Sequence, residues 1–157
     1  MEATEKYLFR FVPTMRCNFK CTYCFLGDTT RRAKGTMFDN HSVNEWIDAM
    51  KQFSDKEIEI YMWGGEPFIL DDTYTLLNAW LQMNHIANGC RIDTNLYFAD
   101  KIAEKCPSGK LKLNCSYHMK YHSLDEEFRK IKKLKDLDMV GMLNFVASEE
   151  NMMKLKQ

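Results

Sequence analysis

Three cysteines lie within eight residues of one another, in the spacing Cys17-x3-Cys21-x2-Cys24. Iron–sulfur clusters are normally held by four cysteine thiolates. Three thiolates therefore predict a [4Fe–4S] cluster in which one iron has no protein ligand and stays open to a substrate or cofactor. The same spacing also fits a zinc knuckle or a chance grouping, so a second motif is needed to decide between them.

The second motif is Gly64-Gly65-Glu66-Pro67, which directly follows a strand-like run at 57–63. That run is rich in β-branched and aromatic residues, as strands are. The motif therefore lies in the loop at a strand's carboxyl end. A plain tight turn is the simplest alternative interpretation of these four residues.

Together the two motifs resemble those of the radical S-adenosylmethionine (radical SAM) superfamily, and the resemblance covers essentially the whole chain. The first motif reads Cys17-Asn18-Phe19-Lys20-Cys21-Thr22-Tyr23-Cys24, with an aromatic residue before the third cysteine, and the second matches the family's GGEP. The resemblance implies that the three cysteines bind a [4Fe–4S] cluster and that S-adenosylmethionine chelates the open iron. Its reductive cleavage would give a 5′-deoxyadenosyl radical that abstracts hydrogen from a substrate, while the protein orients the reactants and excludes side reactions.

Further cofactor contacts are implied by the same resemblance. Gly64, Gly65, Glu66 and Pro67 would hold the amino group of the methionine moiety, since glycine carbonyls and a carboxylate suit an ammonium group. The other expected contacts to S-adenosylmethionine are Tyr23, Asn95, Ser116, Asn144 and Val146. The segment Thr94-Asn95 resembles the family's TNG, but Leu96 replaces the glycine, which puts the local backbone in question. Asn151 resembles a helix-opening asparagine of the family, although plain helix capping also explains it.

Strand and helix patterns alternate along the chain, which predicts an α/β fold with a parallel sheet and right-handed crossovers. Five strands are expected, at 7–12, 57–63, 90–95, 110–116 and 139–147. Capping boxes at Ser42-x-x-Glu45 and Ser123-x-x-Glu126 begin two of the helices. Further helices are expected from Asp72 to near Gly89, over 98–105 and after Ser148.

The helix after Ser123 has the cleanest apolar periodicity. Its predicted buried stripe is Leu124, Phe128, Ile131, Leu134 and Leu137. The lysine-rich run 130–135 is expected to form its solvated face.

The resemblance implies a partial (β/α)6 barrel with its site at the carboxyl ends of the strands. The sequence supplies about five βα units, so the sixth strand is missing, and 1–157 is expected to be a radical SAM core domain that is short or truncated at its C-terminus. The fifth strand would then have an exposed edge, which a partner or self-association would cover.

Side chains alternate between two faces of a strand. The apolar residues of strands two to four should meet the helices, which leaves a polar set facing the lumen: Glu59, Tyr61, Trp63, Arg91, Asp93, Asn95, Lys112, Asn114 and Ser116. Asn144 occupies the same side of strand five, opposite Leu143 and Phe145. Buried polar groups need partners, so this face predicts a polar or charged substrate or, alternatively, an internal hydrogen-bond network.

His118 and His122 follow strand four, at the rim of the predicted site. A histidine there could transfer a proton or bind a substrate carboxylate, and a purely structural role is the alternative. Cys90, Cys106 and Cys115 lack the spacing of a second metal site and are expected to be small buried hydrophobes.

Composition places limits on the partners. Twenty-two basic and twenty-two acidic residues cancel, so neither nucleic acid nor an anionic membrane is expected to bind. No apolar run is long enough to span a bilayer, and residues 1–5 do not read as a signal peptide, so a cytoplasmic location is expected.

Two functional hypotheses follow. The first is a radical SAM enzyme that acts on a polar metabolite or a ribosomally made peptide, with flavodoxin or ferredoxin as electron donor. The second is a non-catalytic iron–sulfur or zinc module that serves in electron transfer or as a partner subunit. The GGEP loop favours the enzyme, because a bare carrier does not need a site for an ammonium group.

Overall fold

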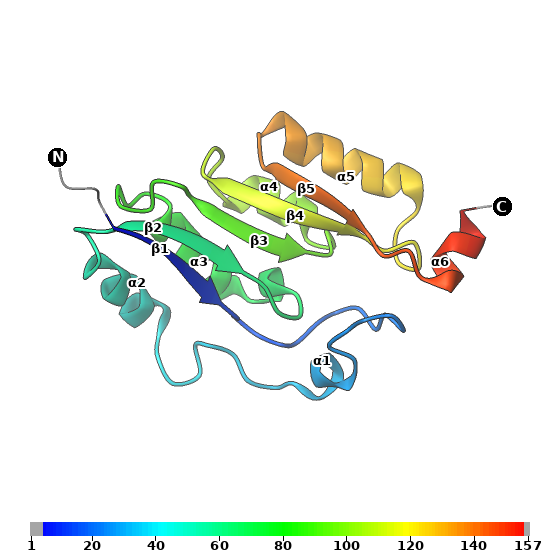
Figure 1. Ribbon diagram of the computed structural model, residues 1–157, viewed down its shortest axis with the longest axis horizontal. Coiled ribbons are helices and arrows are strands. Elements are labelled where there is room, and N and C mark those ends of the chain that lie inside the picture. Colours follow the sequence, from blue (N-terminus) through cyan, green and yellow to red (C-terminus); the bar gives the residue numbers. More distant parts are fainter. Residues whose placement is uncertain (1–4, 156–157) are drawn as a thin grey trace.

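The computed structural model describes residues 5–155, which are built around one five-stranded parallel sheet (Figure 1). The strands lie side by side in chain order and are β1 (Lys6–Phe11), β2 (Glu57–Met62), β3 (Cys90–Thr94), β4 (Leu111–Tyr117) and β5 (Val140–Phe145). Right-handed crossovers add each new strand at the same edge of the sheet, which explains this order. All five predicted strands are confirmed, as is the α/β fold of a short partial barrel.

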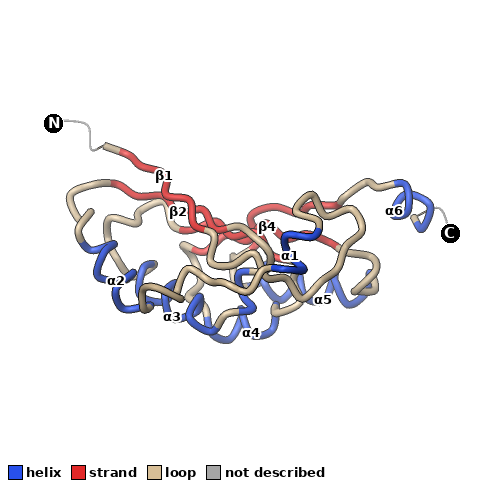
Figure 2. Tube along the Cα trace, turned by 90° about the horizontal axis from the view of Figure 1, so that it is seen from below, coloured by secondary structure: helices blue, strands red, loops and turns tan. Residues whose placement is uncertain are grey.

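The helices are α1 (Asp28–Arg32), α2 (Val43–Lys51), α3 (Asp71–Trp80), α4 (Ala99–Lys105), α5 (Leu124–Asp136) and α6 (Glu149–Lys154), with a 3-10 turn, η1 (Pro67–Ile69). Helices α2 to α5 cover one face of the sheet and leave the other face open, while α6 lies beyond the end of β5 (Figure 2). Among residues 5–155, no helix has the length and apolar character needed to cross a membrane. The predicted lack of a signal peptide concerns residues that lie mostly outside this range.

The two predicted helix caps are present. Ser42 and Glu45 form a full capping box, and the Ser123 hydroxyl accepts a hydrogen bond from the Glu126 backbone N–H at 3.2 Å. The predicted extension of α3 to near Gly89 is wrong, because the helix ends at Trp80. Beyond it the chain makes a series of turns, and the His85 carbonyl accepts a hydrogen bond from Ile58 N–H of β2 at 2.7 Å instead of continuing a helix.

The faces of the sheet divide as the strand patterns predict. The helix-facing side chains of β2, β3 and β4 are buried almost completely: Ile58, Ile60, Met62, Ile92, Leu111, Leu113 and Cys115. Cys90 and Cys106 are also buried and unpaired, as expected for small hydrophobes. The polar side chains of the same strands therefore lie on the open face.

Helix α5 differs from its predicted pattern. Leu124 and Phe128 are 68% and 69% exposed, whereas Lys130, predicted to be solvated, is only 4% exposed. The Lys130 ammonium donates to Glu126 Oε1 at 2.7 Å and lies 3.0 Å from His122 Nδ1, which explains how the charge is accommodated. Leu124 and Phe128 instead line a groove between α5 and β5, at the edge where the sheet ends.

Candidate cofactor site

A cavity of about 190 Å³ lies at the carboxyl ends of the strands and brings most of the predicted site residues together. Its lining includes Cys17, Cys21, Cys24, Tyr23, Gly64, Gly65, Asn95, Ser116, His118 and Val146. Phe25, Leu26 and Thr30, from the cysteine loop and its continuation, also line the cavity and were not predicted to do so. No local pattern marks these three, because only the folding of the loop over the strand ends places them here.

Cys17, Cys21 and Cys24 all line this one cavity. Cys17 Sγ accepts hydrogen bonds from the Phe19 backbone N–H at 3.4 Å and from Asn95 Nδ2 at 3.7 Å. Burial raises the pKa of the Cys17 and Cys21 thiols. Among the described residues, no three metal-ligating side chains are already grouped around a common point. The donor set nevertheless fits an iron–sulfur cluster, because it offers three thiols at one cavity and N–H donors to a sulfur, which such sites use to set their potential.

An aromatic stack holds the cysteine loop against the loop after β4. The Phe19 and Tyr121 rings are stacked, with centroids 3.9 Å apart and an interplanar angle of 6°. The Lys20 backbone N–H also donates to the Tyr121 hydroxyl at 2.6 Å. Phe19 is 5% exposed, so this contact fixes the first half of the motif.

The glycines of the GGEP loop allow it to lie directly on the chain that leads into the cysteines. Gly65 N–H donates to the Thr14 carbonyl at 3.0 Å, and Glu66 N–H donates to the Arg16 carbonyl at 2.8 Å. A Cβ atom on Gly64 would lie 2.4 Å from the Thr14 carbonyl oxygen, and one on Gly65 would lie 2.1 Å from that of Arg16. No side chain fits at either position, so the two motifs depend on each other for their placement.

Glu66 is fully buried beneath the cavity and does not line it. Its carboxylate accepts hydrogen bonds from Thr94 Oγ1 at 3.1 Å and from the backbone N–H groups of Asn95 and Phe68 at 2.7 and 3.2 Å. Burial raises the pKa of Glu66 to about 7, against the opposing effect of these hydrogen bonds. The side chain thus ties the GGEP loop to the end of β3, and Pro67 next to it begins the turn η1.

Leu96, which stands where the resemblance expects glycine, adopts a left-handed backbone conformation. Leu96 has φ of 61°, in the left-handed region that normally favours glycine, and its side chain is fully buried. Asn95 Nδ2 donates to Asn18 Oδ1 at 2.9 Å, which connects this segment to the cysteine loop. A leucine is tolerated here because burial of its side chain offsets the cost of the conformation.

The two histidines after β4 have different surroundings. His118 lines the cavity, with Nδ1 3.0 Å from the Tyr23 hydroxyl and 3.5 Å from Cys21 Sγ, and burial lowers its pKa to about 4. His122 does not line the cavity; it is 5% exposed and its Nδ1 contacts Glu126 and Lys130 of α5. The geometry therefore leaves His118 as the candidate for contact with a ligand.

The two cofactor contacts predicted in and after β5 line different cavities. Val146 lines the cavity, whereas Asn144 lines the groove between α5 and β5. Asn151 Nδ2 donates to the Val146 carbonyl at 2.7 Å, and its backbone N–H donates to the Ser148 hydroxyl. Asn151 therefore both completes the cap of α6 and fixes the backbone that bears Val146.

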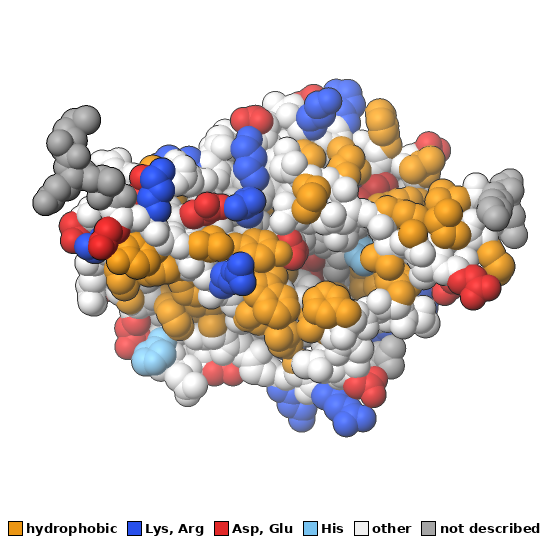
Figure 3. All heavy atoms as spheres, in the orientation of Figure 1, with side chains coloured by type: hydrophobic (Ala, Val, Ile, Leu, Met, Phe, Trp, Pro, Cys, Tyr) orange, Lys and Arg blue, Asp and Glu red, His pale blue; other side chains and the backbone are white. Residues whose placement is uncertain are grey.

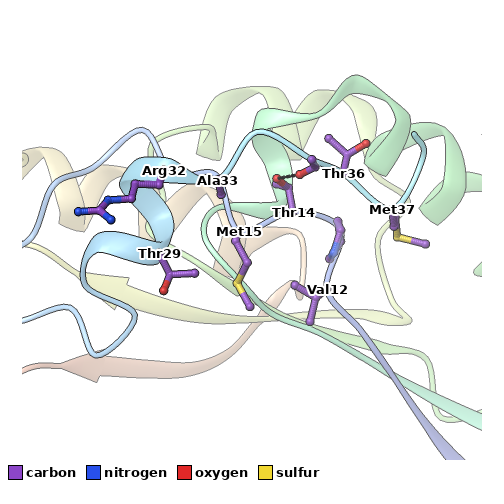
Figure 4. A pocket seen from close by; sticks show the side chains of 10 residues that line it. Val12, Thr14, Met15, Thr29, Arg32, Ala33, Thr36 and Met37 are labelled. Carbon is purple, nitrogen blue, oxygen red and sulfur yellow. Dashed lines mark hydrogen bonds between the residues drawn. The ribbon is translucent and has the colours of Figure 1, made fainter. Parts of the chain in front are cut away.

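A larger cavity, of about 590 Å³, lies behind the cysteine-bearing chain (Figure 4). Its lining joins Val12, Thr14 and Met15 to the segment from Thr29 to Met37, and the Thr14 hydroxyl donates to the Gly35 carbonyl at 2.9 Å. None of the predicted cofactor residues lines it. This cavity lies where α1 and the loop after it fold back onto the segment that follows β1.

Comparison with known proteins identifies the family. The model of the radical SAM superfamily matches residues 11–145. The crystal structure of Streptococcus suis SuiB superposes with a TM-score of 0.64 at 20% identity, over 98% of this chain and 36% of SuiB. Two further SuiB structures, one bound to S-adenosylmethionine and one bound to precursor peptide SuiA, each superpose with a TM-score of 0.58 at 21% identity. Both matches cover 98% of this chain, and they cover 37% of the first structure's chain and 36% of the second's. The chain thus spans little more than a third of these relatives, which at this identity support the fold alone.

A search among curated proteins gave no match to this chain. The superfamily model, by contrast, covers most of its length, from the end of β1 to the end of β5. The protein therefore belongs to the radical SAM superfamily of enzymes.

Proposed function

We propose that residues 1–157 form the core domain of a radical SAM enzyme that binds a [4Fe–4S] cluster through Cys17, Cys21 and Cys24 and binds S-adenosylmethionine beside it. When bound, the cluster and S-adenosylmethionine supply a 5′-deoxyadenosyl radical for hydrogen abstraction. The observation that carries this proposal is the single cavity shared by the three cysteines and the GGEP backbone.

The protein's own residues would position and shield the cofactors. Gly64 and Gly65 offer backbone to the amino group of the methionine moiety, and Glu66 holds Thr94 and Asn95 in place behind them. Tyr23, Ser116 and Val146 line the remaining wall. His118 lies within contact distance of both Tyr23 and Cys21, so it would exclude water from the cluster side of the cavity.

The substrate would enter from the open face of the sheet, and a peptide is one candidate. SuiB, which shares this fold, has been crystallised with its precursor peptide SuiA. The open face carries charged side chains that are partly exposed, among them Glu59, Arg91 and Lys112, which suits a polar metabolite or a peptide side chain. A small electron-transfer protein such as flavodoxin or ferredoxin would supply the electron.

Among residues 5–155, β5 is an edge strand with no further strand beside it. Leu143 and Phe145 are 58% and 37% exposed, and with Leu124 and Phe128 they line an apolar groove of about 400 Å³. Isolated edges with apolar side chains favour association. We propose that further polypeptide, from a partner or a second copy, covers this edge; sedimentation of the chain over a range of concentrations tests self-association.

The proposed reaction is tested by anaerobic reconstitution with iron and sulfide, followed by S-adenosylmethionine and a strong reductant. We expect 5′-deoxyadenosine by mass spectrometry in the wild type and none in Cys24→Ala. Cys106→Ala is the matched control, because Cys106 is a buried thiol outside the motif. Burial raises the pKa of this thiol to about 12. Equal iron content in wild type and Cys24→Ala would overturn the cluster assignment.

A further inference from the structure

A row of basic side chains crosses the open face of the sheet. Strand register places Arg10 of β1 beside Tyr61 of β2, Tyr61 beside Arg91 of β3, and Arg91 beside Lys112 of β4. Neighbours paired in this way project from the same face. Three of the four positions in the row are therefore cationic, and Figure 3 shows basic side chains among hydrophobic ones over this face.

The three cations differ in their counter-charges. Arg91 pairs with Glu59, and Lys112 Nζ lies 2.8 Å from Asp138 Oδ1. For Arg10, by contrast, residues 5–155 provide neither an ion pair nor a hydrogen bond. Like charges side by side on a sheet destabilise it unless they are neutralised. Arg10 is therefore the position in the row that can accept an external anion.

A cavity of about 260 Å³ lies at this guanidinium. Its lining consists of Leu8, Arg10, Tyr61, Arg91 and Asn114. The hydroxyl of Tyr61 and Nδ2 of Asn114 both donate to Asp93, at 2.6 and 2.8 Å. These two donors are already used within the protein, so the guanidinium of Arg10 is the group in the cavity that is left to bind a ligand.

This cavity lies next to the proposed cofactor cavity along the same strands. Tyr61, Arg91 and Asn114 line it, and the residues two positions further on, Trp63, Asp93 and Ser116, line the cofactor cavity. Two residues of a strand span roughly 7 Å. A molecule that reacts at the cofactor cavity would therefore reach Arg10 with a group only a few bonds from its reacting carbon.

We propose that Arg10 forms an anion subsite for the substrate, in which its guanidinium binds a carboxylate on the molecule. The proposal rests on the proposed function and specifies its substrate class: a metabolite or peptide side chain that carries a carboxylate. A planar guanidinium with several N–H donors suits a carboxylate because it can form two parallel hydrogen bonds with it. The hydrogen bonds from Tyr61 and Asn114 to Asp93 hold these two lining side chains of the subsite in place.

The test uses the full chain with arginine side chains labelled for NMR and glutarate as the probe. We expect saturable shifts of the Arg10 side-chain signals with glutarate and none with glutaramide, its uncharged analogue. Arg10→Gln should weaken glutarate binding at least ~10-fold, since a charge-assisted pair is lost. Arg129→Gln is the control, because Arg129 lies on α5 and pairs with Asp100, away from the open face.

Equal glutarate binding by Arg10→Gln and Arg129→Gln would overturn the subsite, as would equal shifts with glutaramide. The failure of the subsite is distinguishable from that of the proposed function, which is scored separately by 5′-deoxyadenosine formation in the wild-type chain. Absent glutarate binding with cofactor cleavage intact rejects the subsite alone. A peptide with a C-terminal amide and one glutamate, compared with free glutarate, then separates a side-chain carboxylate from a metabolite.

Discussion

The carboxylate of Glu66 accepts a hydrogen bond from the backbone N–H of Asn95 at 2.7 Å, which fastens the GGEP loop to the end of β3. Asn95 in turn contacts Cys17 and Asn18 through its side chain. A residue whose type suits a contact with a bound ammonium group therefore also joins the two motif loops inside the protein.

Glu66→Ala is expected to destabilise the fold by about 3 kcal/mol, because it leaves buried N–H donors of Phe68 and Asn95 unpaired and opens a cavity. Urea denaturation measures this loss. Glu104→Ala, at an exposed position on α4, is the control and should change stability little. Equal unfolding midpoints for the two variants would contradict the bracing role of Glu66.

Tyr121 is expected to hold the cysteine loop in place. Tyr121→Phe keeps the stack on Phe19 but loses the hydrogen bond from Lys20, whereas Tyr121→Ala loses both. Iron bound per chain after anaerobic reconstitution should therefore fall from wild type to Tyr121→Phe and further in Tyr121→Ala. Tyr7→Ala, at the far end of β1, serves as the control; the same loss of iron in this variant would argue against a local effect.

The left-handed backbone at Leu96 should reverse the usual order of stability between glycine and alanine variants. At most positions glycine is less stable than alanine by about 0.5–1 kcal/mol. With φ of 61°, position 96 should reverse this order, so that Leu96→Gly unfolds at the same or higher urea concentration than Leu96→Ala. Both variants should be less stable than wild type by ~2–4 kcal/mol because a buried leucine is lost. A Leu96→Ala variant clearly more stable than Leu96→Gly would exclude the left-handed conformation.

The buried carboxyl group of Glu127 is expected to make the stability of the protein depend on pH. Its carboxylate is 2% exposed, neither oxygen has a hydrogen-bond partner among the described residues, and burial raises its pKa to about 7. The folded state therefore holds this proton more tightly than the unfolded state, whose glutamate titrates near pH 4.5. The contribution to stability is complete below pH 4.5 and is lost as the pH rises through about 7.

Glu127→Gln should remove this dependence and stabilise the protein at pH 8 by roughly 1–2 kcal/mol relative to wild type, with little gain at pH 4.5. Urea unfolding of both proteins at the two pH values gives the difference. Glu104→Gln is the matched control because Glu104 is exposed. A Glu127→Gln gain that is the same at both pH values would mean that the effect is packing and not ionisation.

The sequence by itself determined the five strands and the starts of two helices, but not the end of α3 or the short helix α1. Alternating patterns identified all five strands, and serine caps located the starts of α2 and α5, because such signals depend on near neighbours along the chain. The resemblance implied a site at the carboxyl ends of the strands, and the second motif follows the strand at 57–63. The cavity that holds Cys17, Cys21, Cys24, Gly64 and Gly65 agrees with that expectation.

Only the tertiary structure decided which of these side chains face the cavity. Glu66 turns inward toward Thr94 and Asn95, His122 turns toward α5, and Lys130 is buried while Phe128 is exposed. The helical period of α5 assigned the last two incorrectly because a stripe is buried only where another element lies against it. At β5 the sheet ends, and the partners of a side chain there are set by segments distant in sequence, which no local pattern contains.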